Sequence, residues 1–222
     1  MFALSFHEFA HAWMASKCGD NTAARMGRLT LNPMAHLDVM GSMMILFVGF
    51  GWAKPVPVDG RNLENPRVDM MKVAAAGPLS NLLLAMLAGM VFRLLNGTGL
   101  LSESIYLLIL YFTQINIALA VFNLIPVAPL DGSQIFSAYL MRKNPQLAWK
   151  IQSYGPQVLF GLILFGYITG FSILWLFMRP FVNFFMILFW YIIFVTSMTS
   201  ITMKNMKIIF FRVFFYFFYK FF

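Results

Sequence analysis

The sequence predicts an all-α polytopic membrane protein with about five transmembrane helices and one re-entrant or interfacial segment. Two observations support this class. Of the 222 residues, 60% are hydrophobic and only 11% are charged, and the mean hydropathy is +0.76. Ordinary soluble domains carry about 25% charged residues. Several apolar stretches are also long enough to cross a bilayer as a helix, which takes about 20 residues.

Hydropathy and helix breakers give the elements in order. Five apolar stretches are expected to be helices in the membrane: residues 2–16, 73–95, 105–125, 156–178 and 181–203. The last two are separated by Arg179-Pro180, and the stretch 132–150 between spans begins amphipathic and becomes basic. The apolar stretch 39–52 is short and contains Gly41, Gly49 and Gly51, so it is expected to be re-entrant or interfacial rather than a full span.

The polar stretch 53–72 contains Lys54-Pro55-Val56-Pro57-Val58. Its prolines favour an extended or polyproline conformation, so short β-strands are expected near residues 50–60. Residues 1–140 form the expected core, and 141–203 add two C-terminal transmembrane helices. The tail 204–222 is aromatic and basic. It is either an interfacial anchor or sequence read past a frameshift, and no role is assigned to it.

The basic residues predict which way the helices run. If 39–52 does not cross, every Lys and Arg except Arg93 and Arg179 falls on one side of the membrane. The positive-inside rule makes that side cytoplasmic. The formal charge of +8 therefore indicates contact with the lipid bilayer and its surface, not with nucleic acid.

The chemical signal is His7-Glu8-Phe9-Ala10-His11. A helix places positions i and i+4 on one face, so His7 and His11 can bind one metal ion, and Glu8 beside them can take a proton from water. A catalytic zinc takes a third protein ligand. His36 and Asp131 are the candidates. Asp131 is favoured because it follows a proline-rich span end, where an acidic residue is costly unless it binds something.

The combination of these motifs resembles the site-2 protease family of intramembrane zinc metalloproteases. The first motif is His7-Glu8-x-x-His11, and the second is N-x-x-P-x-x-P-L-D-G from Asn123 to Gly132. Further stretches that resemble minimal-core bacterial members are Leu31-Asn32-Pro33, the segment 49–58 and Ala76-Gly77-Pro78-Leu79-Ser80-Asn81. The resemblance covers about residues 1–140.

The resemblance implies one zinc ion held by His7, His11 and Asp131, with Glu8 as general base. It implies that Asn123 helps to hold the substrate or the developing oxyanion, and that Asn123 and Pro126 contact the substrate. The substrates would be transmembrane proteins, cut within or near a membrane-spanning segment. The protein would lie in the bacterial plasma membrane with its active site toward the cytoplasm.

Several alternatives stay open at this point. Asn123 could instead satisfy broken backbone near the prolines, and Asn81 could serve helix packing. The chain could bind membrane segments without cutting them. A metal-binding transporter is a weaker alternative, because the spans after Asp131 contain no charged side chain.

The start of the chain departs from the family pattern, because only six residues precede His7. A helix over residues 2–16 rises about 22 Å, short of the roughly 30 Å bilayer core. The expectation is that the start is truncated, or that Met1 is an internal methionine of a longer frame.

Overall fold

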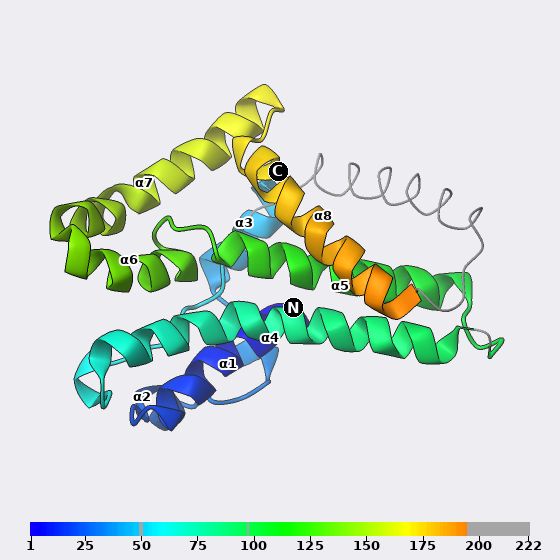
Figure 1. Ribbon diagram of the computed structural model, residues 1–222, viewed down its shortest axis with the longest axis horizontal. Helices are drawn as coiled ribbons and strands as arrows, with labels where there is room; N and C mark the ends of the chain where they lie inside the picture. Colours follow the sequence, from blue (N-terminus) through cyan, green and yellow to red (C-terminus); the bar gives the residue numbers. More distant parts are fainter. Residues whose placement is uncertain (49–50, 97, 195–222) are drawn as a thin grey trace.

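The computed structural model describes residues 1–48, 51–96 and 98–194 (Figure 1). These residues form helices α1 (Phe2–Lys17), α2 (Thr22–Arg25), α3 (Val39–Val48), α4 (Pro66–Leu95), α5 (Glu103–Asn123), α6 (Asp131–Lys143), α7 (Pro145–Thr169) and α8 (Ile173–Phe194). Short 3-10 turns lie at Pro33–Ala35 and Gly60–Asn62. No sheet forms within the described ranges, so the predicted helical class is confirmed there. The tail 204–222 lies outside them.

The described residues support two or three membrane crossings, and the expected five are not confirmed. Helices α4 and α5 are each long and apolar enough to cross, and α7 with α8 gives a third crossing if this pair, bent by 98°, counts as one span. Helix α1 is too short, because its 16 residues rise about 24 Å. Residues 195–203 of the last expected span lie outside the described part of the chain.

The predicted break between the last two helices, at Arg179-Pro180, is wrong. Helix α8 continues through Pro180, and the chain turns earlier, after α7. Gly170 ends α7 with a φ of +70°, a left-handed conformation that glycine adopts without a steric penalty. Ser172 then begins α8, because its Oγ accepts a hydrogen bond from the backbone N–H of Trp175 at 3.1 Å.

The short strands expected near residues 50–60 are not confirmed. Among the described residues the chain pairs there only at an isolated antiparallel bridge between Leu37 and Ala53. Pro55 and Pro57 have no N–H for a strand ladder, and the N–H of Val56 is donated to a side chain instead. Helix α3, which precedes this segment, has ten residues and rises about 15 Å, too little to cross a bilayer.

Helix α4 is the centre of the molecule. It packs against α1, α5, α6 and α8, and Figure 1 shows α4 and α5 side by side along much of their length. The apolar core includes Ile117 and Val121 of α5 with Val182 and Met186 of α8, all buried. Helix α4 therefore contacts both helices that carry the motif residues, α1 with His7 and His11 and α6 with Asp131.

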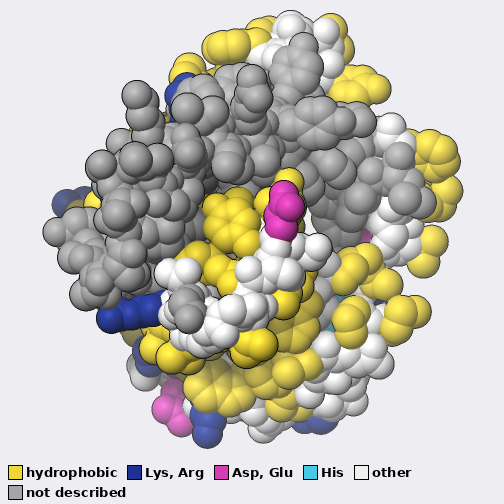
Figure 2. All heavy atoms as spheres, turned by 90° about the vertical axis from the view of Figure 1, so that its right-hand side faces the viewer, with side chains coloured by type: hydrophobic (Ala, Val, Ile, Leu, Met, Phe, Trp, Pro, Cys, Tyr) yellow, Lys and Arg dark blue, Asp and Glu magenta, His cyan; other side chains and the backbone are white. Residues whose placement is uncertain are grey.

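The outer surface of the described helices is largely apolar. Figure 2 shows broad areas of hydrophobic side chains on the described part of one face, interspersed with backbone and scattered charged groups. Leu79 and Leu94 of α4 are 61% and 75% exposed. Apolar side chains facing outward from long apolar helices are what a lipid environment favours.

Candidate metal centre

Helix α1 brings His7 and His11 together on one buried face. The two residues lie one turn apart, and they are only 3% and 8% exposed. Their Nε2 atoms are 3.0 Å apart, and the two rings meet edge to face. Buried alanines on the same helix, Ala12 and Ala15, let α1 pack closely against α4.

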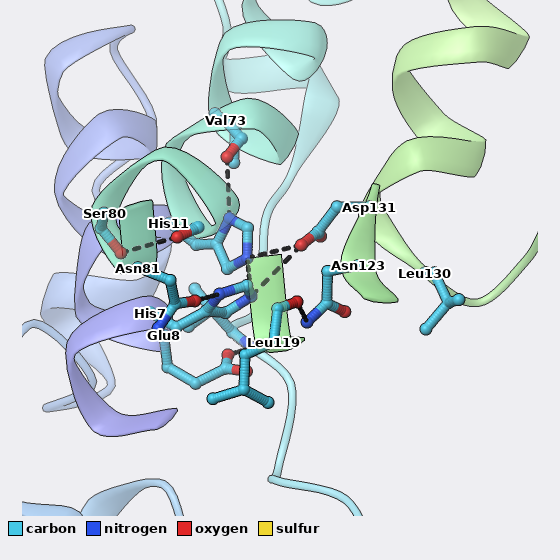
Figure 3. A network of polar contacts seen from close by, with 12 residues as sticks. His7, Glu8, His11, Val73, Ser80, Asn81, Leu119, Asn123, Leu130 and Asp131 are labelled. Atoms are coloured by element: carbon cyan, nitrogen blue, oxygen red, sulfur yellow. Dashed lines mark hydrogen bonds and ion pairs between the residues drawn. The ribbon is translucent and has the colours of Figure 1, made fainter. Parts of the chain in front are cut away.

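The third member of the cluster, Asp131, lies far from the histidines in the sequence. It is the first residue of α6, after the turn that follows α5. Its Oδ2 lies 3.2 Å from Nε2 of His7 and 3.3 Å from Nε2 of His11. Figure 3 shows the three side chains pointing at one spot between α1, α4 and α6. The predicted trio is thus brought together, and His36 is not part of it.

The partners of the two histidines determine where their protons lie. Nδ1 of His11 is 2.7 Å from the carbonyl oxygen of Val73, and Nδ1 of His7 is 2.6 Å from Oδ1 of Asn81. An oxygen of either kind only accepts, so both Nδ1 atoms carry a proton. The neutral form of each ring then presents a lone pair at Nε2. Both Val73 and Asn81 lie on α4, which therefore orients both rings.

The cluster fits a zinc ion. Two Nε2 lone pairs and a carboxylate oxygen face one another, and no hydrogen bond satisfies the buried Oδ2 of Asp131. Such acceptors repel one another unless a cation lies between them. Nitrogen and oxygen ligands at about 2.0–2.2 Å in a tetrahedron lie roughly 3.3 Å apart, close to the observed separations of 3.0, 3.2 and 3.3 Å. Three ligands leave a position for water.

Gly77 of α4 lies directly against this cluster. A Cβ built on Gly77 would collide with Nε2 of His11 and would lie 2.6 Å from Cε1 of His7. A side chain at this position would therefore occupy the space of the histidine rings. The absence of a side chain lets α4 approach α1 closely enough for Asn81 to reach His7.

Glu8 lies beside the cluster with its carboxylate tied to the chain after α3. It is 9% exposed, and its Oε2 accepts a hydrogen bond from the backbone N–H of Val56 at 3.2 Å. Within the described contacts, Glu8 is not one of the three converging groups. A carboxylate next to a metal site and outside its ligand set is placed to exchange protons with a bound water.

Asn123 lies at the edge of the site, whereas Pro126 lies in the exposed turn that follows α5. Figure 3 shows Asn123 next to Asp131, near the end of α5. Its Nδ2 donates to the carbonyl of Leu119 one turn back, at 3.0 Å. That bond goes to its own helix and not to the backbone near the prolines, and a direct contact with substrate stays a prediction. Pro126 is exposed in the turn between α5 and α6, and its predicted substrate contact is untested.

The family follows from comparison with known proteins. The family model for peptidase family M50 matches residues 1–109 and 97–166. The chain belongs to this family. M50 is the site-2 protease family that the motifs resemble, so the predicted family, the predicted enzyme class and zinc as the metal are confirmed.

Individual M50 relatives agree with this membership. A protein of Bacillus subtilis (strain 168) named "Putative zinc metalloprotease YwhC" is 39% identical over 178 residues, which cover 78% of this chain and 80% of that protein. A protein of Mycobacterium tuberculosis (strain ATCC 35801 / TMC 107 / Erdman) named "Putative zinc metalloprotease Rip2" is 30% identical over 175 residues. The match covers 74% of this chain but less than two thirds, 64%, of Rip2. No solved structure matches the chain.

Two parts of this M50 site were missed by the sequence analysis. Close helix packing, an expectation for the stretch from Gly77 to Asn81, fits Gly77, but its specific approach to the histidine rings and the contact of Asn81 with His7 were not predicted. The contact of Val56 with Glu8 was not predicted either. The proline pattern around Val56 was the available signal, because it leaves a single N–H at residues 55–57.

Proposed function

We propose that this M50 metalloprotease hydrolyses peptide bonds in or near transmembrane segments of other proteins, with zinc held by His7, His11 and Asp131. The observation that supports this most is the convergence of three acceptor atoms within 3.3 Å of one another in a buried site. Zinc bound there supplies Lewis acidity for peptide hydrolysis. The remaining chemistry falls to side chains of the chain itself.

Glu8 is the proposed general base. Its carboxylate accepts a proton as the oxygen of a water molecule bonds to the carbonyl carbon of the scissile peptide. As the C–N bond then breaks, Glu8 returns the proton to the departing amine nitrogen. The backbone N–H of Val56 donates to Oε2 of Glu8. This bond orients the Glu8 carboxylate before the substrate arrives. Asn123, at the edge of the site, and Pro126, in the turn between α5 and α6, are the proposed substrate contacts.

The proposed substrates are membrane-spanning because the site lies against a long apolar helix. Helices α1, α4 and α6 surround the site, and α4 is one of the helices that is long enough to cross the bilayer. A helical peptide bond is covered by its own turn, so the substrate must be locally unwound there. The proposed location is a bacterial plasma membrane, and the basic loops support a site on its cytoplasmic side, where water can reach it.

The deciding experiment compares the parent chain with Glu8→Gln on a panel of single-span membrane proteins reconstituted in liposomes. The expected result is cleavage by the parent and a loss of about 100-fold or more in Glu8→Gln, with zinc content unchanged. Glu64→Gln, at an exposed loop residue, is the matched control and should cleave like the parent.

Two other outcomes would decide against the proposal. Cleavage that survives Glu8→Gln would remove Glu8 from the mechanism. Zinc binding without any Glu8-dependent cleavage would instead identify a protein that binds membrane segments without cutting them.

A further inference from the structure

We infer that Asn81 and Asn116 are positioning residues, forming a buried amide relay that fixes which ring nitrogen of His7 faces the metal. The inference rests on the proposed metal centre and deepens it. Asn81 lies on α4 and Asn116 on α5, and both are 0% exposed. Neither belongs to the three converging groups, so the relay acts through His7.

The direction of every hydrogen bond in the relay is fixed from its far end. Nδ2 of Asn116 is 2.8 Å from the carbonyl oxygen of Phe112, which can only accept. Oδ1 of Asn116 is therefore the atom that faces Asn81, and it accepts from Nδ2 of Asn81 at 2.9 Å. The same Nδ2 also donates to the carbonyl of Ala3 at 3.1 Å.

Oδ1 of Asn81 then determines which ring nitrogen of His7 carries the proton. With both protons of its Nδ2 used, Asn81 turns Oδ1 toward the ring, and it lies 2.6 Å from Nδ1 of His7. Nδ1 must therefore donate, and Nε2 is left as a lone pair pointing at His11 and Asp131 (Figure 3). A backbone carbonyl of α5 thus determines the metal-binding state of a ring on α1.

The relay also joins three helices at the depth of the site. Ala3 belongs to α1, Asn81 to α4 and Asn116 to α5, and each link is buried. Water does not reach the links to replace a lost partner, so the relay must be complete or its amides stay unsatisfied. Turning the amide of Asn81 over would place its Nδ2 against Nδ1–H of His7 and would also cost both donor bonds.

The two histidines depend on different kinds of partner. His11 is oriented by a backbone carbonyl, that of Val73, which no side-chain substitution removes. His7 is oriented by a side chain that is in turn oriented by another. Substitutions in the relay should therefore affect His7 selectively and leave His11 in its observed state.

The first test measures zinc affinity of the purified full chain in detergent by competition with a chelator. Asn81→Leu should weaken zinc binding by about 10–100-fold, the usual effect of removing a partner of a metal-bound histidine. Asn116→Leu should weaken it less but in the same direction, because it removes one of the two acceptors that orient the Asn81 amide, whereas the carbonyl of Ala3 still accepts from Nδ2 of Asn81. No cleavage is needed for this measurement.

The second test reads the protons on His7 directly. The chain contains three histidines, so ¹⁵N-histidine labelling gives a spectrum that is assigned by substituting each histidine in turn. The spectrum is recorded on the metal-free protein at a pH high enough for the imidazoles to be neutral. The parent should show His7 protonated at Nδ1 alone. Asn81→Leu should lose that signature at His7 and keep it at His11, a change that loosened packing alone does not produce.

The controls are buried polar residues next to each relay member. Ser80→Ala removes a hydroxyl that bonds to the carbonyl of Gly77 in its own helix, and Thr113→Val removes one that bonds to the carbonyl of Ile109 in its own helix. Both should match the parent in zinc affinity and in the histidine spectrum.

The relay is refuted if folded Asn81→Leu binds zinc within about threefold of the parent, below the range expected for such a partner, and keeps the Nδ1–H signature at His7. If Asn81→Leu does not fold, Asn116→Leu decides by the same two measurements. A parent chain that binds no zinc would refute the proposed function, whereas the spectrum would still test the relay.

Discussion

Val56 donates its backbone N–H to Oε2 of Glu8 across 3.2 Å. The residues on either side of Val56 are prolines, which carry no N–H, so this is the single backbone donor of the tripeptide 55–57. Two prolines that exclude a strand ladder thus leave one donor beside the proposed general base. The loop after α3 is thereby tied to the site on α1.

Val56→Pro should therefore lower proteolytic activity while leaving zinc in place. The substitution removes the donor and frees Glu8 to rotate, and loss of such positioning should reduce kcat/KM by about 10-fold or more. Rates on a reconstituted membrane substrate, together with zinc content, provide the measurement. Val56→Ala keeps the N–H and should behave like the parent, so equal activity of the proline and alanine variants would contradict this role.

Asp131→Asn tests whether Asp131, the first residue of α6, binds the metal. Its Oδ2 lies 3.2 and 3.3 Å from the two histidine nitrogens, and the amide replaces a charged oxygen with a neutral one. Zinc affinity should fall by more than the roughly 100-fold that loss of an outer partner costs, as measured by chelator competition. Glu103→Gln, an exposed acidic residue at the start of α5, should leave affinity unchanged. Full zinc occupancy in Asp131→Asn would remove Asp131 from the ligand set.

The three ligands could be predicted from the sequence, because the histidine pair and Asp131 are each recognisable from their neighbours in the chain. His7 and His11 have the spacing of one helical turn, and Asp131 follows two prolines, Pro126 and Pro129, at the end of an apolar span. An acidic group at such a place is expensive without a partner. The structure joins these two local signals in one cluster.

The partners of these residues could not be predicted in the same way. The contacts of His7 with Asn81 and of Glu8 with Val56 join positions far apart in the chain. They depend on how closely α1, α4 and the loop after α3 approach one another, which no periodicity records. The position of the α7–α8 turn was missed for a different reason, because Pro180 is accommodated within a helix while Gly170 provides the turn.

Asp20 should make folding stability dependent on pH below about 4. The side chain is 0% exposed and joins the chain after α1 to the turn before α4. Burial alone would raise the pKa of Asp20, but hydrogen bonds from Thr22, Asn62 and the N–H of Asp59 outweigh it and lower the pKa. A lowered folded pKa stabilises the fold above the unfolded pKa and ceases to do so as pH falls through the folded value.

Asp20→Asn should therefore melt at a lower temperature than the parent at pH 7. The difference should shrink as the pH falls below about 4, toward the folded pKa. Melting curves in detergent at several pH values provide the measurement. Asp59→Asn is the control: Arg61 lowers the pKa of Asp59 to about 2, but the Arg61 side chain is 89% exposed, and such surface pairs contribute little. A difference for Asp20→Asn that does not change with pH would contradict the titration of Asp20.

Gly77→Ala should disrupt the metal centre through a single methyl group. The added Cβ would collide with His11 and crowd His7, so α4 must shift or the rings must turn away from their partners. Overpacking of this kind costs about 1–3 kcal/mol, and zinc affinity should fall with it. Gly161→Ala in α7 is the matched control, because a Cβ there meets nothing within 4 Å and alanine favours the helix by up to about 1 kcal/mol. Melting temperature and zinc affinity should therefore fall together in Gly77→Ala and hold or rise in Gly161→Ala. Parent-like zinc binding in Gly77→Ala would show that α4 does not need this close approach to the histidines.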